Sequence, residues 1–158
     1  MIKVLFICHG NICRSPMAEF ILKDMLRGSS VEGKVFVASK ATHTDEIWNG
    51  HGNDMYPPAK KVLSSHGIPF EKREATLLEI SDYDEYDMLI GMDRENSFVM
   101  NRMFPGDRKN KIYKLMSFAG KNDDVSDPWY TRDFERAYND IYSGCLGLIE
   151  YLKTMKIK

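Results

Sequence analysis

The 158-residue sequence contains few cysteines, little net charge and no apolar run long enough for a membrane span. Its three cysteines are Cys8, Cys13 and Cys145, and so small an odd number argues against a disulfide framework and indicates a reducing, cytoplasmic setting. The formal net charge of −1 gives no indication of a nucleic-acid or anionic-membrane partner. The apolar run from Ile2 to Cys8 is far shorter than the roughly 20 residues that span a bilayer. We therefore expect a cytoplasmic protein that binds neither nucleic acid nor membrane.

Recognisable metal-binding motifs are also lacking. The sequence has no CxxC pair and no HExxH, and its histidines are scattered at His9, His43, His51 and His66. We expect no metal site and no cofactor. Internal repeats and flexible linkers are not apparent either, so the length predicts one domain over residues 1–158.

The hydrophobic pattern predicts strands that alternate with helices. Strands are expected at 2–8, 35–38, 86–92 and 111–115, and helices from Ser15-Pro16 to before Gly28, at about 55–66, at 94–103 and from Phe134 to Leu152. Residues 40–54 and 117–130 are predicted to be loops. This alternation favours an α/β domain with a parallel sheet. Ligands of such sheets bind beyond the carboxyl ends of the strands, where Cys8 is expected.

The segment that follows the first strand carries the clearest chemical signal. It reads Cys8, His9, Gly10, Asn11, Ile12, Cys13, Arg14, Ser15. Backbone N–H groups of a loop that enters a helix form an anion-binding nest, and Gly10 and Asn11 tolerate the close or left-handed backbone that such a loop needs. The Arg14 guanidinium adds donors for two phosphate oxygens. A thiolate at Cys8 in this field is predicted to attack phosphorus, and Ser15 is either a donor to that thiolate or the helix N-cap.

Phosphoryl transfer to a thiolate also needs a proton donor for the leaving oxygen. Asp127, which precedes a proline in the predicted 117–130 loop, is the best candidate, with Asp123 and Asp124 as alternatives on spacing. Trp129 and Tyr130 follow Pro128 and are candidates to line the binding slot of an aromatic leaving group.

The stretch CHGNICRSP, from Cys8 to Pro16, closely resembles the C-x-G-N-x-C-R-S-P signature of the low-molecular-weight protein tyrosine phosphatases. The resemblance extends over essentially the whole chain and includes a late Asp-Pro-aromatic-aromatic element at 127–130. It implies a three-layer α/β/α fold with a four-stranded parallel sheet, and a phosphotyrosine-containing protein or small aryl phosphate as substrate. It also implies that Cys8 is the nucleophile, Arg14 the phosphate clamp and Asp127 the general acid and base, without a metal.

The same resemblance implies supporting roles around the loop. Asn11 and Ser15 would hold the loop, His66 would brace Asn11, and Cys13 is either an oxidative disulfide partner of Cys8 or a packed thiol. Trp48 is matched to a substrate-lining aromatic residue of the family, across a loop that looks longer than usual. His9 stands where the family commonly has an apolar or small residue. We expect a monomer or weak dimer.

Three other functions are alternatives to a phosphotyrosine phosphatase. An arsenate reductase of related fold needs two further cysteines for its thiol relay, and only Cys145 lies outside the loop. Phosphoarginine phosphatases resemble this loop but carry threonine at the position of Ile12, so the isoleucine favours phosphotyrosine. A catalytically silent phosphopeptide-binding module is disfavoured because Cys8, Arg14 and Asp127 are all present.

Overall fold

The core of the fold is a four-stranded parallel sheet, seen in a computed structural model that describes residues 1–155. Its strands are β1 (Ile2–Cys8), β2 (Val35–Ala41), β5 (Met88–Gly91) and β6 (Ile112–Lys114). They lie in the order β2-β1-β5-β6, and each neighbouring pair is parallel. The predicted α/β fold with a four-stranded parallel sheet is therefore confirmed.

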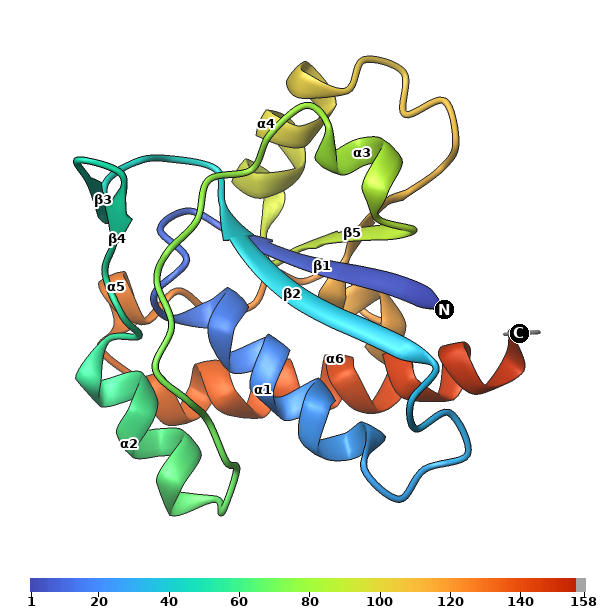
Figure 1. Ribbon diagram of the computed structural model, residues 1–158. Helices are drawn as coiled ribbons and strands as arrows, with labels where there is room; N and C mark the ends of the chain where they lie inside the picture. The colour runs from blue at the N-terminus through green and yellow to red at the C-terminus, as the bar shows by residue number, and fades with distance from the viewer. Residues whose placement is uncertain (156–158) are drawn as a thin grey trace.

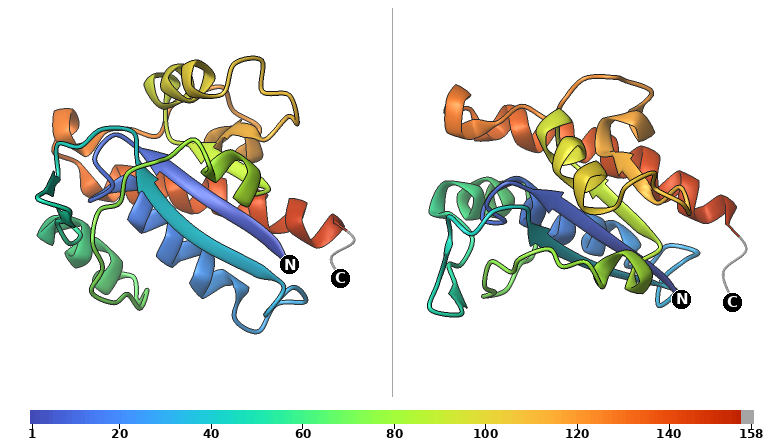
Figure 2. Two further views of the ribbon diagram at one scale, coloured as in Figure 1. Left: turned by 45° about the horizontal axis from the view of Figure 1, so that its top comes forward. Right: turned by 90° about the horizontal axis from the view of Figure 1, so that it is seen from above.

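Helices cover both faces of this sheet (Figure 1). The long helices are α1 (Arg14–Leu26), α2 (Pro57–Ser65), α4 (Arg94–Met103) and α6 (Phe134–Thr154), and the short ones are α3 (Asp82–Glu85), the 3-10 helix η1 (Leu115–Ala119) and α5 (Pro128–Thr131). Helices α1 and α6 lie on one face, with α3 and α4 on the other (Figures 1 and 2). This is the expected three-layer arrangement. Within residues 1–155, none of the helices combines the length and the apolar composition that a membrane crossing requires.

Strand β1 shows why an uninterrupted apolar run belongs at the centre of the sheet. Successive side chains of a strand point to opposite faces. Val4 and Phe6 pack in the cluster that includes α1 and α6, whereas Leu5 and Ile7 pack with Leu89 and residues of α4. Because both faces are covered by helices, all of these β1 positions must be apolar.

The largest departure from the predicted elements lies in the segment 40–54. Strand β2 continues to Ala41, and the expected loop contains a two-stranded hairpin of β3 (Ile47–Trp48) and β4 (His51–Gly52). Its two turn residues, Asn49 and Gly50, have positive φ values of 49° and 77°. An Asn-Gly pair is a strong hairpin signal, so the turn was readable from the sequence.

Shorter elements also differ from expectation. Helices α3 and α5 each have only four residues, and η1 and α5 occupy part of the predicted 117–130 loop. Helix α1 starts at Arg14 and has Cys13 as its N-cap, without a side-chain capping bond. Ser15 is therefore not the N-cap, and the alternative, a contact with Cys8, is the one observed.

Candidate active site

The loop between β1 and α1 lies at the carboxyl edge of the sheet (Figure 1). Cys8 is the last residue of β1, and Arg14 is the first of α1. Asn11 adopts the left-handed conformation with φ of 59°, as its residue type permits. At Gly10 the backbone lies close to the Glu46 side chain, since a Cβ atom added to Gly10 would lie 3.3 Å from Cγ of Glu46.

The Cys8 sulfur is buried and surrounded by hydrogen-bond donors. The Ser15 hydroxyl lies 2.9 Å from Sγ, and the backbone N–H groups of Asn11 and Ser15 lie 3.3 and 3.4 Å from it. These groups favour a negatively charged sulfur, because hydrogen bonds to the charged form stabilise it. The loop thus presents the Cys8 sulfur to these donors beside the N-terminus of α1.

The Asn11 side chain holds the loop through four hydrogen bonds. Its amide donates to Ser15 Oγ at 2.8 Å and to Ser39 Oγ at 2.9 Å. Its Oδ1 accepts from Arg73 Nη2 at 2.5 Å and from the Thr76 N–H at 3.0 Å. Two donors and two acceptor sites are all that an asparagine amide offers, so this buried group is fully satisfied.

His66 lies elsewhere, and the expectation that it braces Asn11 is wrong. Its Nε2 is hydrogen-bonded to Glu135, and its ring stacks on Tyr138 at 3.9 Å. His66 is the C-cap of α2 and therefore ties α2 to α6 instead of supporting the loop. The physical reason is that Arg73 and Thr76 already occupy Oδ1 of Asn11.

Arg14 is almost fully buried, with its guanidinium fixed from three directions. Its Nη2 lies 2.8 Å from Asp93 Oδ2 and 3.5 Å from Asp127 Oδ2, and Nη1 donates to the Val125 carbonyl at 3.1 Å. Burial opposes the charge, but Cys8, Asp93 and Asp127 outweigh it and raise the pKa of Arg14 above its ordinary value. The structure thus brings together the predicted thiol, arginine and carboxylate.

Asp127 is the one of the three candidate acids that lies near the loop residues. Its Oδ1 accepts the Trp129 N–H at 3.0 Å, which leaves Oδ2 directed at Arg14. Oδ1 of Asp124 lies 2.7 Å from Nζ of Lys114 and accepts the backbone N–H of Arg94. Asp123 is exposed. The geometry therefore favours Asp127 as the proton donor.

Comparison with known proteins identifies the family of this chain. The family described as low molecular weight phosphotyrosine protein phosphatase matches residues 3–157. The chain belongs to this family. It is a protein-tyrosine phosphatase, a hydrolase of phosphotyrosine.

Individual relatives agree over nearly the full length. The chain is 35% identical over 153 residues to the low molecular weight protein-tyrosine-phosphatase PtpA of Staphylococcus aureus, covering 96% of this chain and 94% of PtpA. The crystal structure of YfkJ from Bacillus subtilis is 35% identical with a TM-score of 0.88, covering 99% of this chain and 97% of YfkJ. SP-PTP, a low molecular weight protein tyrosine phosphatase from Streptococcus pyogenes, is 34% identical with a TM-score of 0.81, covering 98% and 99%.

Asp93 and Arg73 are among the residues that contact the loop of this phosphatase and were not predicted from the sequence. Asp93, which pairs with Arg14, follows strand β5 directly at the same edge of the sheet, and that position was a usable signal. Arg73, which donates to Asn11, lies in an irregular segment, and no pattern marks it.

The candidate substrate-lining aromatic residues of the phosphatase are all highly exposed. Trp129 and Tyr130 lie on α5 and are 74% and 82% exposed, and Trp48 lies on β3 and is 79% exposed. The β3–β4 hairpin and α5 lie at the same end of the molecule as the β1–α1 loop (Figures 1 and 2). Their rings are therefore accessible at the end of the molecule where this loop lies.

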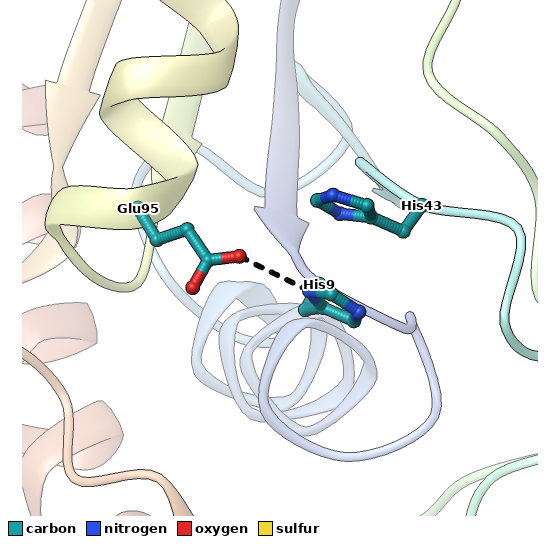
Figure 3. A group of neighbouring side chains, drawn as sticks. All are labelled: His9, His43 and Glu95. Atoms are coloured by element: carbon teal, nitrogen blue, oxygen red, sulfur yellow. Dashed lines mark hydrogen bonds and ion pairs between the residues drawn. The ribbon is translucent and has the colours of Figure 1, made fainter.

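Two of the histidines of the phosphatase, treated as scattered in the sequence, are stacked. The rings of His9 and His43 lie 4.0 Å apart with an angle of 12° between them. Figure 3 shows His9 directed at Glu95 of α4, and Asp45 lies 2.7 Å from its other nitrogen. Burial lowers the pKa of His9, but hydrogen bonds with Asp45 and Glu95 outweigh burial and raise it above 6.5.

Proposed function

We propose that Cys8 is the nucleophile of this phosphatase. Its Sγ attacks the phosphorus of phosphotyrosine, an S–P bond forms, and the bond from phosphorus to the tyrosine oxygen breaks. The observation that carries this proposal is the buried Sγ encircled by the Ser15 hydroxyl and two backbone N–H groups at 2.9 to 3.4 Å. The amides of residues 9–14 and the Arg14 guanidinium would stabilise the charge on the transferring phosphoryl oxygens.

Asp127 completes the cycle in this proposal. Its protonated carboxyl gives a proton to the departing tyrosine oxygen, and the carboxylate then takes a proton from the water that attacks the phosphocysteine. The S–P bond breaks, inorganic phosphate leaves, and the Cys8 thiolate and protonated Asp127 are restored. The position of Oδ2 near Arg14, which binds the phosphate, supports this assignment.

Trapping of the covalent intermediate tests the proposal. Rapid acid quench of wild type with ³²P-labelled phosphotyrosine peptide should yield a labelled phosphocysteine peptide that contains Cys8. Cys8→Ser should give no labelled intermediate and no turnover, while still binding inorganic phosphate. With a ³²P-labelled aryl phosphate whose leaving group needs no proton, Asp127→Ala should accumulate the label, because the intermediate still forms while its hydrolysis loses its base. Label on another residue would refute Cys8 as the nucleophile.

The substrate class is proposed to be phosphotyrosine in proteins or small aryl phosphates. A thiol relay for arsenate reduction is opposed by the burial of Cys145, whose Sγ contacts the Ala18 carbonyl. Phosphoarginine is opposed by Ile12, whose side chain offers no hydroxyl. A parallel assay of phosphotyrosine peptide, phosphoarginine and arsenate separates the three, and turnover of phosphotyrosine alone is expected.

We also propose that the phosphatase works in the cytoplasm as a monomer or weak dimer. Its three cysteines are all unpaired, which suits a reducing compartment. Light scattering over a concentration series measures the mass, and a stable higher oligomer would contradict this part of the proposal.

A further inference from the structure

Three segments that are distant in the sequence bring imidazole and carboxylate groups together beside the phosphate-binding loop (Figure 3). His9 lies in that loop, His43 follows β2, and Glu95 lies in the first turn of α4. The backbone fixes the two histidines side by side, because the His43 N–H donates to the His9 carbonyl at 3.1 Å. The pairing of β1 with β2 thus continues past the end of β2.

The ligand atoms of these side chains are close to coordination distance. One such atom from each of His9, His43 and Glu95 can be chosen so that all lie within 4.8 Å of one another. Tetrahedral zinc with bonds near 2.0–2.1 Å needs separations of about 3.4 Å between ligands. His9 Nδ1 and Glu95 Oε1 are already 3.3 Å apart. All three side chains are at least partly exposed, so they have room to rotate toward a bound ion.

The surroundings of His9 also suit a metal ligand. Asp45 Oδ2 lies 2.7 Å from Nε2, and a carboxylate can only accept, so Nε2 carries a proton. Nδ1 faces Glu95 Oε1, so by the same rule it donates a proton to that carboxylate in the metal-free protein. An ion that binds between Nδ1 and Oε1 takes the place of this proton, which is released to solvent. A carboxylate at the far nitrogen of a histidine is the usual device that orients metal-binding imidazoles.

His43 is held in a comparable way. Its Nδ1 is hydrogen-bonded to Thr42 Oγ1 at 2.7 Å, which leaves Nε2 as the available ligand atom. Parallel rings at 4.0 Å direct their lone pairs side by side and not toward a common point. Binding of an ion therefore requires the His43 ring to turn out of the stack.

We propose that His9, His43 and Glu95 form a binding site for a divalent first-row transition ion of the zinc class, with Asp45 orienting His9. Two imidazoles and one carboxylate with open positions are a donor set that such ions favour over magnesium or calcium. The site departs from our expectation of a metal-free chain, because the fold joins residues whose sequence spacing forms no motif. It does not depend on the proposed catalytic mechanism.

Direct titration with Zn²⁺ alone tests the site. Metal-free wild type and Cys8→Ser should each bind one equivalent of Zn²⁺ with the same affinity. Calorimetry, or competition with a chromophoric chelator, measures this affinity. His43→Gln and Glu95→Gln should each weaken binding at least tenfold, since loss even of an orienting group costs about 10–100-fold. His51→Gln is the matched control, because His51 is an exposed histidine beside Glu74, and it should bind as wild type does.

Cobalt spectra identify the donor atoms. Co²⁺ bound to wild type should give visible bands of a nitrogen- and oxygen-bound ion without a near-ultraviolet thiolate-to-cobalt band, and His43→Gln should lose them. Circular dichroism of the two variants, and their unchanged hydrolysis rate without metal, show that they remain folded. The proposal is overturned if one-equivalent binding survives both His43→Gln and Glu95→Gln, or if it disappears in Cys8→Ser.

Discussion

Arg14 and Asp93 form a largely buried ion pair, with 2.8 Å between Nη2 and Oδ2. The Arg14 side chain is 4% exposed and that of Asp93 is 17% exposed. The same aspartate caps α4 through its other oxygen, which accepts the Asn96 N–H at 2.9 Å. One side chain thus fixes both the start of α4 and the orientation of the guanidinium that is proposed to bind phosphate.

Asp93→Asn should lower kcat/KM for aryl phosphates by about 10–100-fold, because small displacements of a positioned group cost up to about a hundredfold. Asparagine is as good an N-cap as aspartate, so α4 should persist and the loss should come from Arg14. Steady-state kinetics together with a thermal unfolding curve measure the two effects separately.

Asp124→Asn is the matched control. This aspartate lies at the same edge of the sheet but pairs with Lys114, and its loss should change kcat/KM less than twofold. Equal losses in both variants would show that the net charge of this edge matters and that the pairing with Arg14 does not.

The β1 strand and helices α4 and α6 were predictable because their patterns are long or well bounded. Strand 2–8 and helix 94–103 have their predicted limits, and α6 extends only two residues past Leu152. The two-residue strands of the hairpin 47–52 and the four-residue helices were not predicted, because elements this short bury too little apolar surface to show a period. The hairpin's Asn49-Gly50 turn did carry a signal, which was overlooked.

The candidate site divides in the same way. The stretch CHGNICRSP identified Cys8 and Arg14, because both residues lie in the same short segment of the sequence. The partners that hold the loop come from β2, from the N-cap of α4 and from the segment near Arg73, and only the fold brings them together. The role expected for His66 rested on the family resemblance alone, and in this chain Arg73 occupies the asparagine oxygen instead.

Arg73→Met should weaken phosphate binding, because it removes a charged donor from Asn11 while keeping a side chain of similar length. A hydrogen bond to a charged group contributes about 1.5–3 kcal/mol, which corresponds to roughly a tenfold or larger rise in the inhibition constant of inorganic phosphate. Competitive inhibition by phosphate is the measurement. The Thr76 N–H remains on Oδ1, so the loop should not collapse.

His66→Gln provides the contrast. It removes the stack on Tyr138 and the pair with Glu135, and it should lower the unfolding free energy by less than about 1 kcal/mol. The phosphate inhibition constant should not change. A rise equal to that of Arg73→Met would restore His66 as the residue that supports the loop.

Cys13 should be far less reactive than Cys8 toward alkylating agents at neutral pH. Burial, reinforced by the charges of Cys8 and Asp127, raises the pKa of Cys13 to about 12. A raised thiol pKa means that the reactive thiolate forms only as the pH approaches that value, so Cys13 stays protonated near pH 7. Peptide mapping after one equivalent of iodoacetate should find the label on Cys8, with protection by phosphate. In Cys8→Ser, labelling should fall to near zero, whereas rapid labelling of Cys13 would contradict the protonated state.

Gly147→Ala should destabilise the fold through the contact between α6 and η1. A Cβ atom at this position would lie 1.8 Å from the Phe118 carbonyl oxygen, so the helices must separate. Overpacking costs about 1–3 kcal/mol and outweighs the roughly 1 kcal/mol that alanine contributes as a better helix former. Urea unfolding should show a lower midpoint. Ser143→Ala, on the exposed side of the same helix, should leave the midpoint unchanged or raise it slightly. An unchanged midpoint in Gly147→Ala would refute the close packing.

Asp127→Ala should reduce hydrolysis most for substrates whose leaving groups are poor. A general acid contributes about 10²–10⁴-fold, and that contribution matters only where the departing oxygen needs a proton. Rates of the phosphorylation step for a series of aryl phosphates should therefore depend more steeply on leaving-group pKa in the variant than in wild type. Asp124→Ala should keep the wild-type slope, because its carboxylate faces Lys114 and not Arg14. An equal loss for all leaving groups in Asp127→Ala would assign proton transfer to another group.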